Sequence, residues 1–107
     1  MRKEVTFYSE GCKMAADLYV PDGGEREALP GILMCHGFAG IKQLILPSYA
    51  NEFVKKGFAV LAFDYRGFGA SEGIRGRLVP RDQIADIRNA LTYLAGLKEV
   101  DPTRIGL

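Results

Sequence analysis

The stretch Ile32-Leu33-Met34-Cys35-His36-Gly37-Phe38-Ala39-Gly40 decides the fold of this chain. Its first four residues form an unbroken apolar run, which is typical of a strand buried on both faces, as in a parallel sheet covered by helices. The run leads directly into a Gly-rich turn that begins at His36. Because open α/β sheets bind ligands beyond the C-terminal ends of their strands, this turn is a candidate binding loop.

The residues before this strand predict a hairpin. Apolar and polar side chains alternate over residues 5–8 and again over residues 13–20, on either side of Glu10-Gly11. Such alternation indicates two antiparallel strands with one buried face. Residues 21–30 are rich in proline, glycine and charge, and they predict a loop.

The residues after the turn predict a helix and a second buried strand. Pro47 suits the first turn of a short helix whose Tyr49, Phe53 and Val54 share a face, and Gly57 suits its end. Residues 58–63 are almost entirely apolar and predict a strand of the same buried kind as residues 32–35.

The last third of the chain predicts another helix and the start of a strand. Apolar residues recur at three- and four-residue spacing from a start near Pro80, which marks an amphipathic helix; they are Ile84, Ile87, Leu91 and Leu94. Asp101-Pro102 is expected to break the chain, and residues 104–107 to begin one more strand.

This order predicts one partial α/β domain over residues 1–107, with an antiparallel hairpin followed by parallel strands and covering helices. The last strand is expected to be incomplete. A strand that follows a crossover helix normally lies inside such a sheet. Either the chain continues elsewhere, or one edge of the sheet is left open.

Composition narrows the class of protein. Of 107 residues, 48% are hydrophobic and 25% are charged, which predicts a folded globular chain. The net charge of +1 and the scattered basic residues give no sign of a nucleic acid or membrane partner. Cys12 and Cys35 have no metal-ligand or redox spacing, and no signal peptide precedes the hairpin, so we expect a reducing cytoplasm and no metal.

The turn from His36 to Gly40 has two possible interpretations, one catalytic and one structural. Its flanking glycines, Gly37 and Gly40, let the backbone approach a ligand and turn its N–H groups outward. Such donors stabilise the negative charge that develops on a carbonyl oxygen during acyl transfer. The alternative is a Gly-rich turn needed only for tight packing, and this motif alone does not decide between the two.

A second loop follows the second buried strand, with the sequence Asp64-Tyr65-Arg66-Gly67-Phe68-Gly69-Ala70-Ser71. Taken in order, His-Gly-Phe-x-Gly, Asp-x-Arg-Gly-x-Gly-x-Ser, an amphipathic helix and then Asp-Pro-x-Arg-Ile-Gly-Leu resemble the N-terminal part of α/β-hydrolases. Within that superfamily the chain looks most like serine hydrolases of the dienelactone hydrolase and X-Pro dipeptidyl-peptidase type.

The resemblance implies an oxyanion hole to which the Phe38 backbone N–H contributes, and an acyl pocket with Phe38, Ala39, Tyr65 and Phe68 as candidate walls. It implies no cofactor. The Gly-x-Ser-x-Gly turn that would carry the nucleophile comes after Arg-Ile-Gly-Leu in this family, so the nucleophile, acid and base are expected to lie outside this chain. Structural roles are expected for the remaining loop residues, namely His36, Gly37, Gly40, Asp64, Arg66, Gly67 and Gly69.

Several residues have a catalytic reading that we consider weaker than a structural one. Residues 69–73 match Gly-x-Ser-x-Gly, but they do not join a strand directly to a helix, so Ser71 is interpreted as a decoy. His36 precedes the position at which this fold places its base, and Asp64 with Arg66 more often fixes a loop than catalyses. Gly67-Phe68-Gly69 lacks the third glycine of a dinucleotide fingerprint, because residue 72 is Glu72.

The sequence therefore favours the N-terminal part of a serine hydrolase that cleaves an ester, thioester or amide of a small molecule or peptide, inactive as this chain alone. A second hypothesis is a non-catalytic fragment that associates with itself or a partner through its open sheet edge. A third is a dinucleotide-binding fragment.

Overall fold

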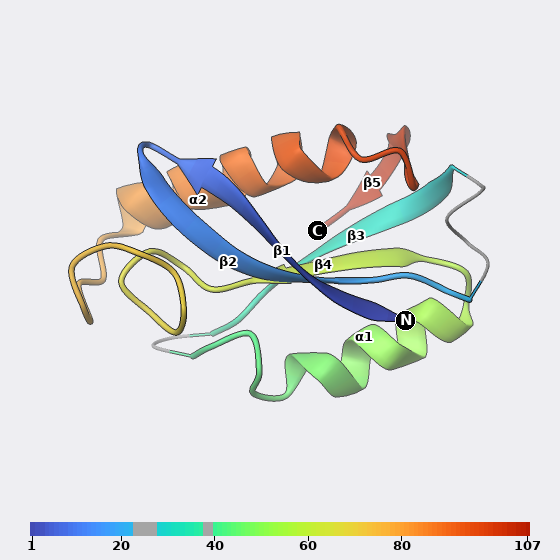
Figure 1. The fold of residues 1–107 in the computed structure, drawn as a ribbon, viewed down its shortest axis with the longest axis horizontal. Coiled ribbons are helices and arrows are strands. Elements are labelled where there is room, and N and C mark those ends of the chain that lie inside the picture. Colours follow the sequence, from blue (N-terminus) through green and yellow to red (C-terminus); the bar gives the residue numbers. More distant parts are fainter. Residues whose placement is uncertain (23–27, 38–39) are drawn as a thin grey trace.

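The structure is a computed structural model that describes residues 1–22, 28–37 and 40–107. Its elements are β1 (Arg2–Ser9), β2 (Cys12–Tyr19), β3 (Leu29–Cys35), α1 (Leu46–Lys55), β4 (Ala59–Phe63), α2 (Pro80–Ala95) and β5 (Val100–Gly106). They form a sheet of order β1-β2-β4-β3-β5, in which β3 runs parallel to β4 and β5. Figure 1 shows α1 and α2 on opposite faces of this sheet, so the predicted α/β class is confirmed.

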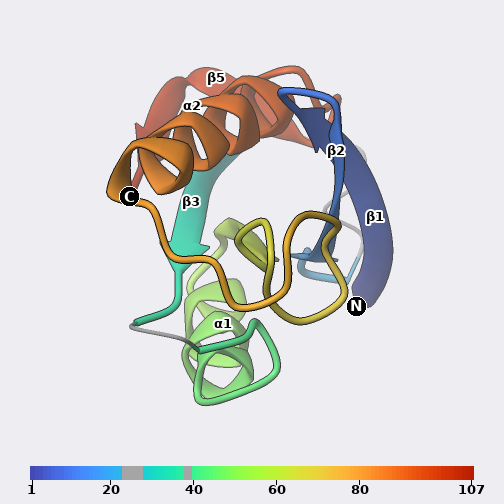
Figure 2. The same cartoon turned by 90° about the vertical axis from the view of Figure 1, so that its left-hand side faces the viewer.

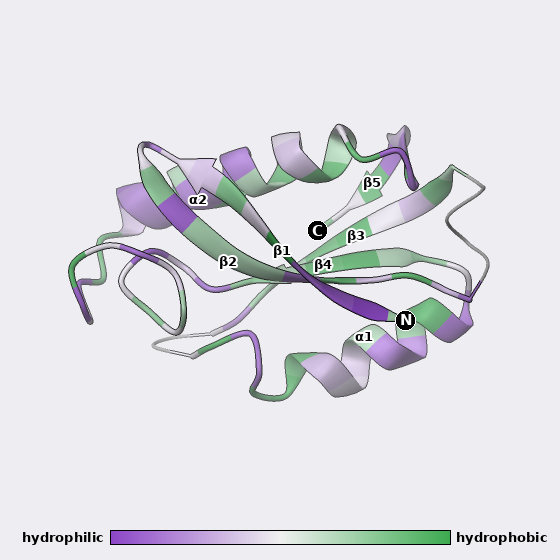
Figure 3. Cartoon of the chain, viewed as in Figure 1, coloured by the Kyte–Doolittle hydropathy of each residue, from purple (hydrophilic) through white to green (hydrophobic). Residues whose placement is uncertain are grey.

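The sheet has an apolar layer on each face. Leu61 and Phe63 of β4 pack in the cluster that includes Leu94 of α2, whereas Val60 and Ala62 pack with Leu46 and Ala50 of α1. Every residue of β4 is buried, and Figure 3 shows the strand as hydrophobic along its length. The expectation of strands covered on both faces is confirmed for β4, because its side chains alternate between two apolar layers.

The hairpin differs in part from its prediction. β1 and β2 pair in antiparallel fashion as expected, and Tyr8 on β1 faces outward. In β2, however, residues 16–19 are all buried. The prediction of one buried face is wrong for β2, because this strand also pairs with β4 and lies inside the sheet, where α1 approaches its other face.

The two helices have the predicted extents, and most residues of their predicted apolar faces pack against the sheet, with one exception in each helix. Gly57 follows α1 in the left-handed region at φ 93°, as its role of terminator requires. Tyr49 is 56% exposed and Ile84 is 55% exposed, so their predicted core positions are wrong. The buried positions are Leu46 and Ala50 in α1 and Asp86, Ala90 and Leu94 in α2.

The start of β5 was predicted incorrectly. Asp101-Pro102 lies within the strand and does not precede it. The pairing of β5 with β3 is irregular at this point, because Leu29 faces Val100 while Gly31 already faces Ile105. Proline is tolerated here since β5 is an edge strand. Among the described residues β5 lies at one edge of the sheet, which leaves open whether the chain continues elsewhere.

The loops that follow β3 and β4 leave the same end of the sheet, as parallel neighbouring strands require. Figure 2 views the molecule from that end and shows the loop before α1 and the long loop before α2 facing the reader together. Side chains from the two loops can therefore form one site.

Candidate active site

His36 anchors the loop that follows β3. It is buried, and its ring packs edge-on against Tyr65 with centroids 4.7 Å apart. The backbone N–H of Tyr65 donates to Nε2 at 3.4 Å, and Nδ1 lies 3.0 Å from the carbonyl oxygen of Gly37. Since both ring nitrogens have backbone partners, His36 is poorly placed to act as a base, which supports the structural role predicted for it.

Gly37 and Gly40 define a tight turn after His36. The N–H of Gly40 donates to the carbonyl of Gly37 at 3.0 Å. A Cβ on Gly40 would lie 3.3 Å from Nδ1 of His36, so a larger residue would press on the histidine ring. Phe38 and Ala39 lie outside the described residues, and the oxyanion role of Phe38 and the wall role of both stay predictions.

Asp64 connects the two loops. It is buried, its Oδ1 accepts the N–H of Lys42 at 2.7 Å, and its Oδ2 accepts the N–H of Ala70 at 3.0 Å. Gly69 lies against this carboxylate at φ 53°, and a Cβ there would be 2.3 Å from Oδ2. Both carboxylate oxygens therefore serve the backbone, which supports a structural role for Asp64 and Gly69.

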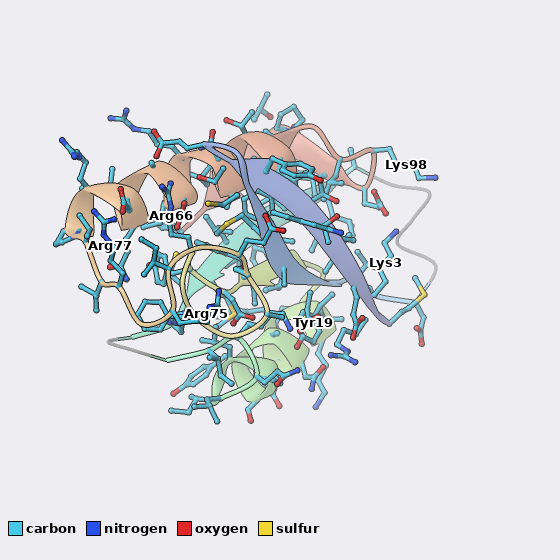
Figure 4. The ribbon with its side chains drawn as sticks, turned by 60° about the vertical axis from the view of Figure 1, so that its left-hand side comes forward. Lys3, Tyr19, Arg66, Arg75, Arg77 and Lys98 are labelled. Atoms are coloured by element: carbon cyan, nitrogen blue, oxygen red, sulfur yellow. The ribbon has the colours of Figure 1, made fainter. Side chains whose placement is uncertain are left out.

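Ser71 is held inside the loop instead of being presented to solvent. Its hydroxyl donates to the carbonyl of Asp64 at 2.6 Å and accepts the N–H of Ala15 at 2.9 Å. Arg75 donates to the carbonyls of Gly69 and Ser71, and Figure 4 shows it within the curve of this loop. A serine nucleophile needs a free hydroxyl beside a base, so these contacts support the interpretation of Ser71 as a decoy.

Arg66 is committed to a network beneath α2. Its guanidinium donates to Oδ1 of Asp86 at 2.8 Å and to Glu10 at 2.8 Å, and Ser9 donates to the same oxygen of Asp86 at 2.7 Å. Figure 4 shows Arg66 beside α2. Hydrogen bonding to Asp86 raises the pKa of Arg66 further above its ordinary value. Gly67, at φ 84°, lets the chain turn directly after this arginine.

Asp86 is the residue of this network that sequence reasoning missed. It is fully buried on α2 and lies four residues before Ala90 and eight before Leu94, which are also fully buried. An acid within an apolar stripe of that spacing is unusual, because a buried carboxylate needs a charged or hydrogen-bonding partner. That spacing was the available signal.

Tyr65 and Phe68 were expected to line an acyl pocket. Tyr65 is buried, and its ring packs edge-on against Phe63 with centroids 5.1 Å apart. Burial raises the pKa of its phenol, and burial likewise raises the pKa of the Cys35 thiol. Phe68 is partly buried against the core. Their wall role stays a prediction, and Cys35 has the character of a core thiol rather than a nucleophile.

An open cavity of about 350 Å³ lies beside the His36 loop on the α1 side. Leu44 and Ile45 contribute exposed apolar side chains to it. Ile45 has φ 66° and ψ −47°, and the N–H of Leu46 donates to the carbonyl of Leu44 across it at 2.6 Å. This is a γ-turn of the positive-φ kind, a rare and strained conformation for a β-branched residue.

A sheet of order β1-β2-β4-β3-β5, with Gly-rich loops at the C-terminal ends of β3 and β4, places this chain in the class of α/β-hydrolases. More particularly, the chain belongs to the family described as serine aminopeptidase, S33, whose family model matches residues 27–103.

Individual relatives and a solved structure are similar to this chain over most of its length. The chain is 46% identical over 99 residues to an uncharacterized 31.7 kDa protein in the traX-finO intergenic region of Escherichia coli, covering 92% of this chain and 33% of that protein. It is 40% identical over 106 residues to the thiohydrolase aneE of Aspergillus aculeatus, covering 97% and 32%. The crystal structure of the α/β-hydrolase GrgF from Penicillium sp. sh18 has a TM-score of 0.90 at 29% identity, covering 100% and 37%. The chain thus spans about a third of the length of the curated relatives it matches.

Proposed function

We propose that the protein to which this chain belongs is a serine hydrolase that cleaves an ester, thioester or amide through an acyl-enzyme. The observation that carries the proposal is the hydrogen bond from the Gly40 N–H to the Gly37 carbonyl just after β3, with His36 beside Gly37 and Asp64 accepting the N–H of Lys42. Backbone donors at this place would suit an oxyanion hole, because preorganised donors need no rearrangement as charge develops.

In the proposed reaction a serine hydroxyl attacks the substrate carbonyl while a histidine accepts its proton and an acidic residue orients that histidine. The Phe38 N–H contributes to the oxyanion hole. The same histidine then protonates the leaving group, and water releases the acyl group. Because His36, Asp64 and Ser71 all hold loop structure, we propose that the nucleophile, base and acid come from outside these 107 residues.

We further propose a hydrolase of the dienelactone hydrolase or X-Pro dipeptidyl-peptidase type, acting on a small molecule or peptide. The name of the similar thiohydrolase supports including thioesters among the substrates. Among the described residues no helix is long and apolar enough to cross a membrane. We propose a reducing cytoplasm as the location, where Cys12 and Cys35 stay free thiols.

The experiment is an intact-mass measurement after treatment with a fluorophosphonate, which bonds covalently to an activated serine. We expect no adduct on the 107-residue chain and one adduct on the full-length protein. An adduct on the short chain that disappears in Ser71→Ala would make Ser71 the nucleophile. No adduct on either protein would contradict the proposed serine mechanism.

A second candidate, self-association of this chain through β5, is favoured by the open edge. Beside β5 lies a groove of about 510 Å³, whose apolar lining includes Ile32, Phe53, Phe58, Ile105 and Leu107. An unpaired edge strand with apolar neighbours can recruit a second strand. Sedimentation of the 107-residue chain should show a dimer that Ile105→Lys dissociates, whereas a monomer at every concentration would exclude this candidate.

A further inference from the structure

Lys42 and Asp17 form a buried ion pair that the proposed reaction does not use. Nζ of Lys42 lies 3.5 Å from Oδ2 of Asp17, and the side chains are only 6% and 1% exposed. Taking two charges out of water costs several kcal/mol per ion, on the order of what their attraction returns. An apolar pair of the same volume would serve stability at least as well, so this pair calls for a geometric explanation.

Asp17 is the residue of this ion pair that lies in the sheet. It lies on β2, where it faces Ala62 of β4 across the sheet. The guanidinium group of Arg2 also lies 3.4 Å from its Oδ2. Its Oδ1 is buried and has no hydrogen-bond partner among the described residues. Burial and the charge of Asp17 raise the pKa of Tyr19. The buried side chain of Asp17 therefore depends on its cationic partners Lys42 and Arg2.

Lys42 is the loop residue of this ion pair, and it makes two contacts. Its ammonium group contacts Asp17, and its backbone N–H donates to Oδ1 of Asp64 at 2.7 Å. It lies two residues after Gly40, so the turn that begins at His36 lies just before it in the chain. The loop is thus held at two places, by the contact of His36 with Tyr65 in the loop after β4 and by the pair of Lys42 with Asp17 on β2.

We propose that the Asp17–Lys42 ion pair is a positioning device that fixes the loop after Gly40 to β2 and so supports the proposed oxyanion donor, the Phe38 N–H, which precedes it in the chain. This inference rests on the proposed function. A pair of charges suits the task because it favours one separation and direction, whereas apolar contacts tolerate sliding. Neither residue touches the substrate, and both act through the loop.

The expected effect follows from the cost of losing an oxyanion donor, which is about 100- to 1,000-fold in kcat. A displaced donor keeps part of its interaction, so we expect removal of the pair to lower kcat by roughly 10- to 100-fold. KM should change less than about threefold, because the oxyanion donor acts mainly on the transition state.

The test compares full-length variants in the hydrolysis of p-nitrophenyl butyrate, with active sites counted by fluorophosphonate titration. Asp17→Leu with Lys42→Met replaces the pair by apolar side chains, and we expect it to unfold at or above the wild-type temperature while kcat falls. Lys42→Arg keeps the charge and should recover most of the rate. Lys55→Met removes an exposed ion pair with Glu52 and serves as the matched control, with kcat unchanged.

Hydrogen exchange of the peptide spanning residues 36–44 gives a readout that needs no activity. We expect faster exchange there in the double variant than in Lys55→Met. A stable double variant with wild-type kcat, or one with unchanged exchange in this peptide, overturns the inference while the hydrolase proposal stands. If the double variant does not fold, Asp17→Asn and Lys42→Arg decide by the same two readouts. Absence of hydrolysis and labelling in the wild type defeats the proposed function, and exchange still tests the pair.

Discussion

Replacing Gly69 by alanine should unfold the junction between the two loops. The new Cβ would lie 2.3 Å from Oδ2 and 2.6 Å from Oδ1 of Asp64, so the carboxylate has to move. That carboxylate accepts the N–H groups of Lys42 and Ala70. Hydrogen bonds to a charged acceptor contribute about 1.5–3 kcal/mol each, so losing both costs about 3–6 kcal/mol.

Backbone strain adds a smaller contribution that can be measured separately. Placing alanine in the left-handed region costs about 1–2 kcal/mol. Gly76 lies in the same loop at φ 75°, and a Cβ added there would meet nothing within 4 Å, so Gly76→Ala reports strain alone. We expect Gly69→Ala to destabilise the protein by at least about 3 kcal/mol and Gly76→Ala by about 1–2 kcal/mol.

The assay is urea unfolding of both variants beside the wild type, with the slope compared to check that the same surface unfolds. Equal losses at the two glycines would refute the reasoning, because the collision with Asp64 would then cost nothing beyond strain. A large loss only at Gly69 would assign the difference to the Asp64 carboxylate.

Two further predictions concern charges elsewhere. Asp86→Ala leaves the Arg66 guanidinium without its main partner and should cost about 3 kcal/mol in urea unfolding; the added loss from Arg66→Met in that background should be small, and additive losses would contradict the pairing. Hydrogen bonding to Lys3 lowers the pKa of Glu99, so its stabilisation is present above its ordinary pKa of 4.5 and is lost as pH falls through the lower folded value. Glu99→Gln should therefore be less stable than the wild type at pH 7 by about 0.5–1 kcal/mol, with the difference vanishing in acid, and a pH-independent difference would contradict the assignment.

Local pattern was enough to predict most elements of the fold. The buried strands were found because their side chains are apolar on both faces, and Gly57 marked the end of α1 because its φ is positive. The errors in the helices concern one position in each, while the rest of the predicted faces packs against the sheet. Tyr49 and Ile84 carry apolar side chains, yet the position of each helix over the sheet leaves them exposed. That choice depends on tertiary packing, which a helical period does not encode.

The site was predicted less completely, because its contacts join residues far apart in the chain. The loops after β3 and β4 were found from their glycines and their place after buried strands. The link from Lys42 to Asp17 has no local signature, since 25 positions separate the two residues. The γ-turn at Ile45 has no local signature either. Isoleucine is not among the residues that typically form turns, so its position gives no sign of one.

Three buried aspartates bind described residues of the two Gly-rich loops. Asp64 binds the backbone of both loops, Asp86 holds Arg66 of the second loop, and Asp17 holds Lys42 of the first. Each carboxylate is carried by, or directly follows, a regular element of the fold. Glycine allows the sharp turns but also allows the backbone many other conformations. The contacts of the three aspartates limit those conformations. The geometry of this candidate site is therefore set by the sheet and α2, so substitutions at these three positions should disturb the loops more than substitutions on the loops' outer surfaces.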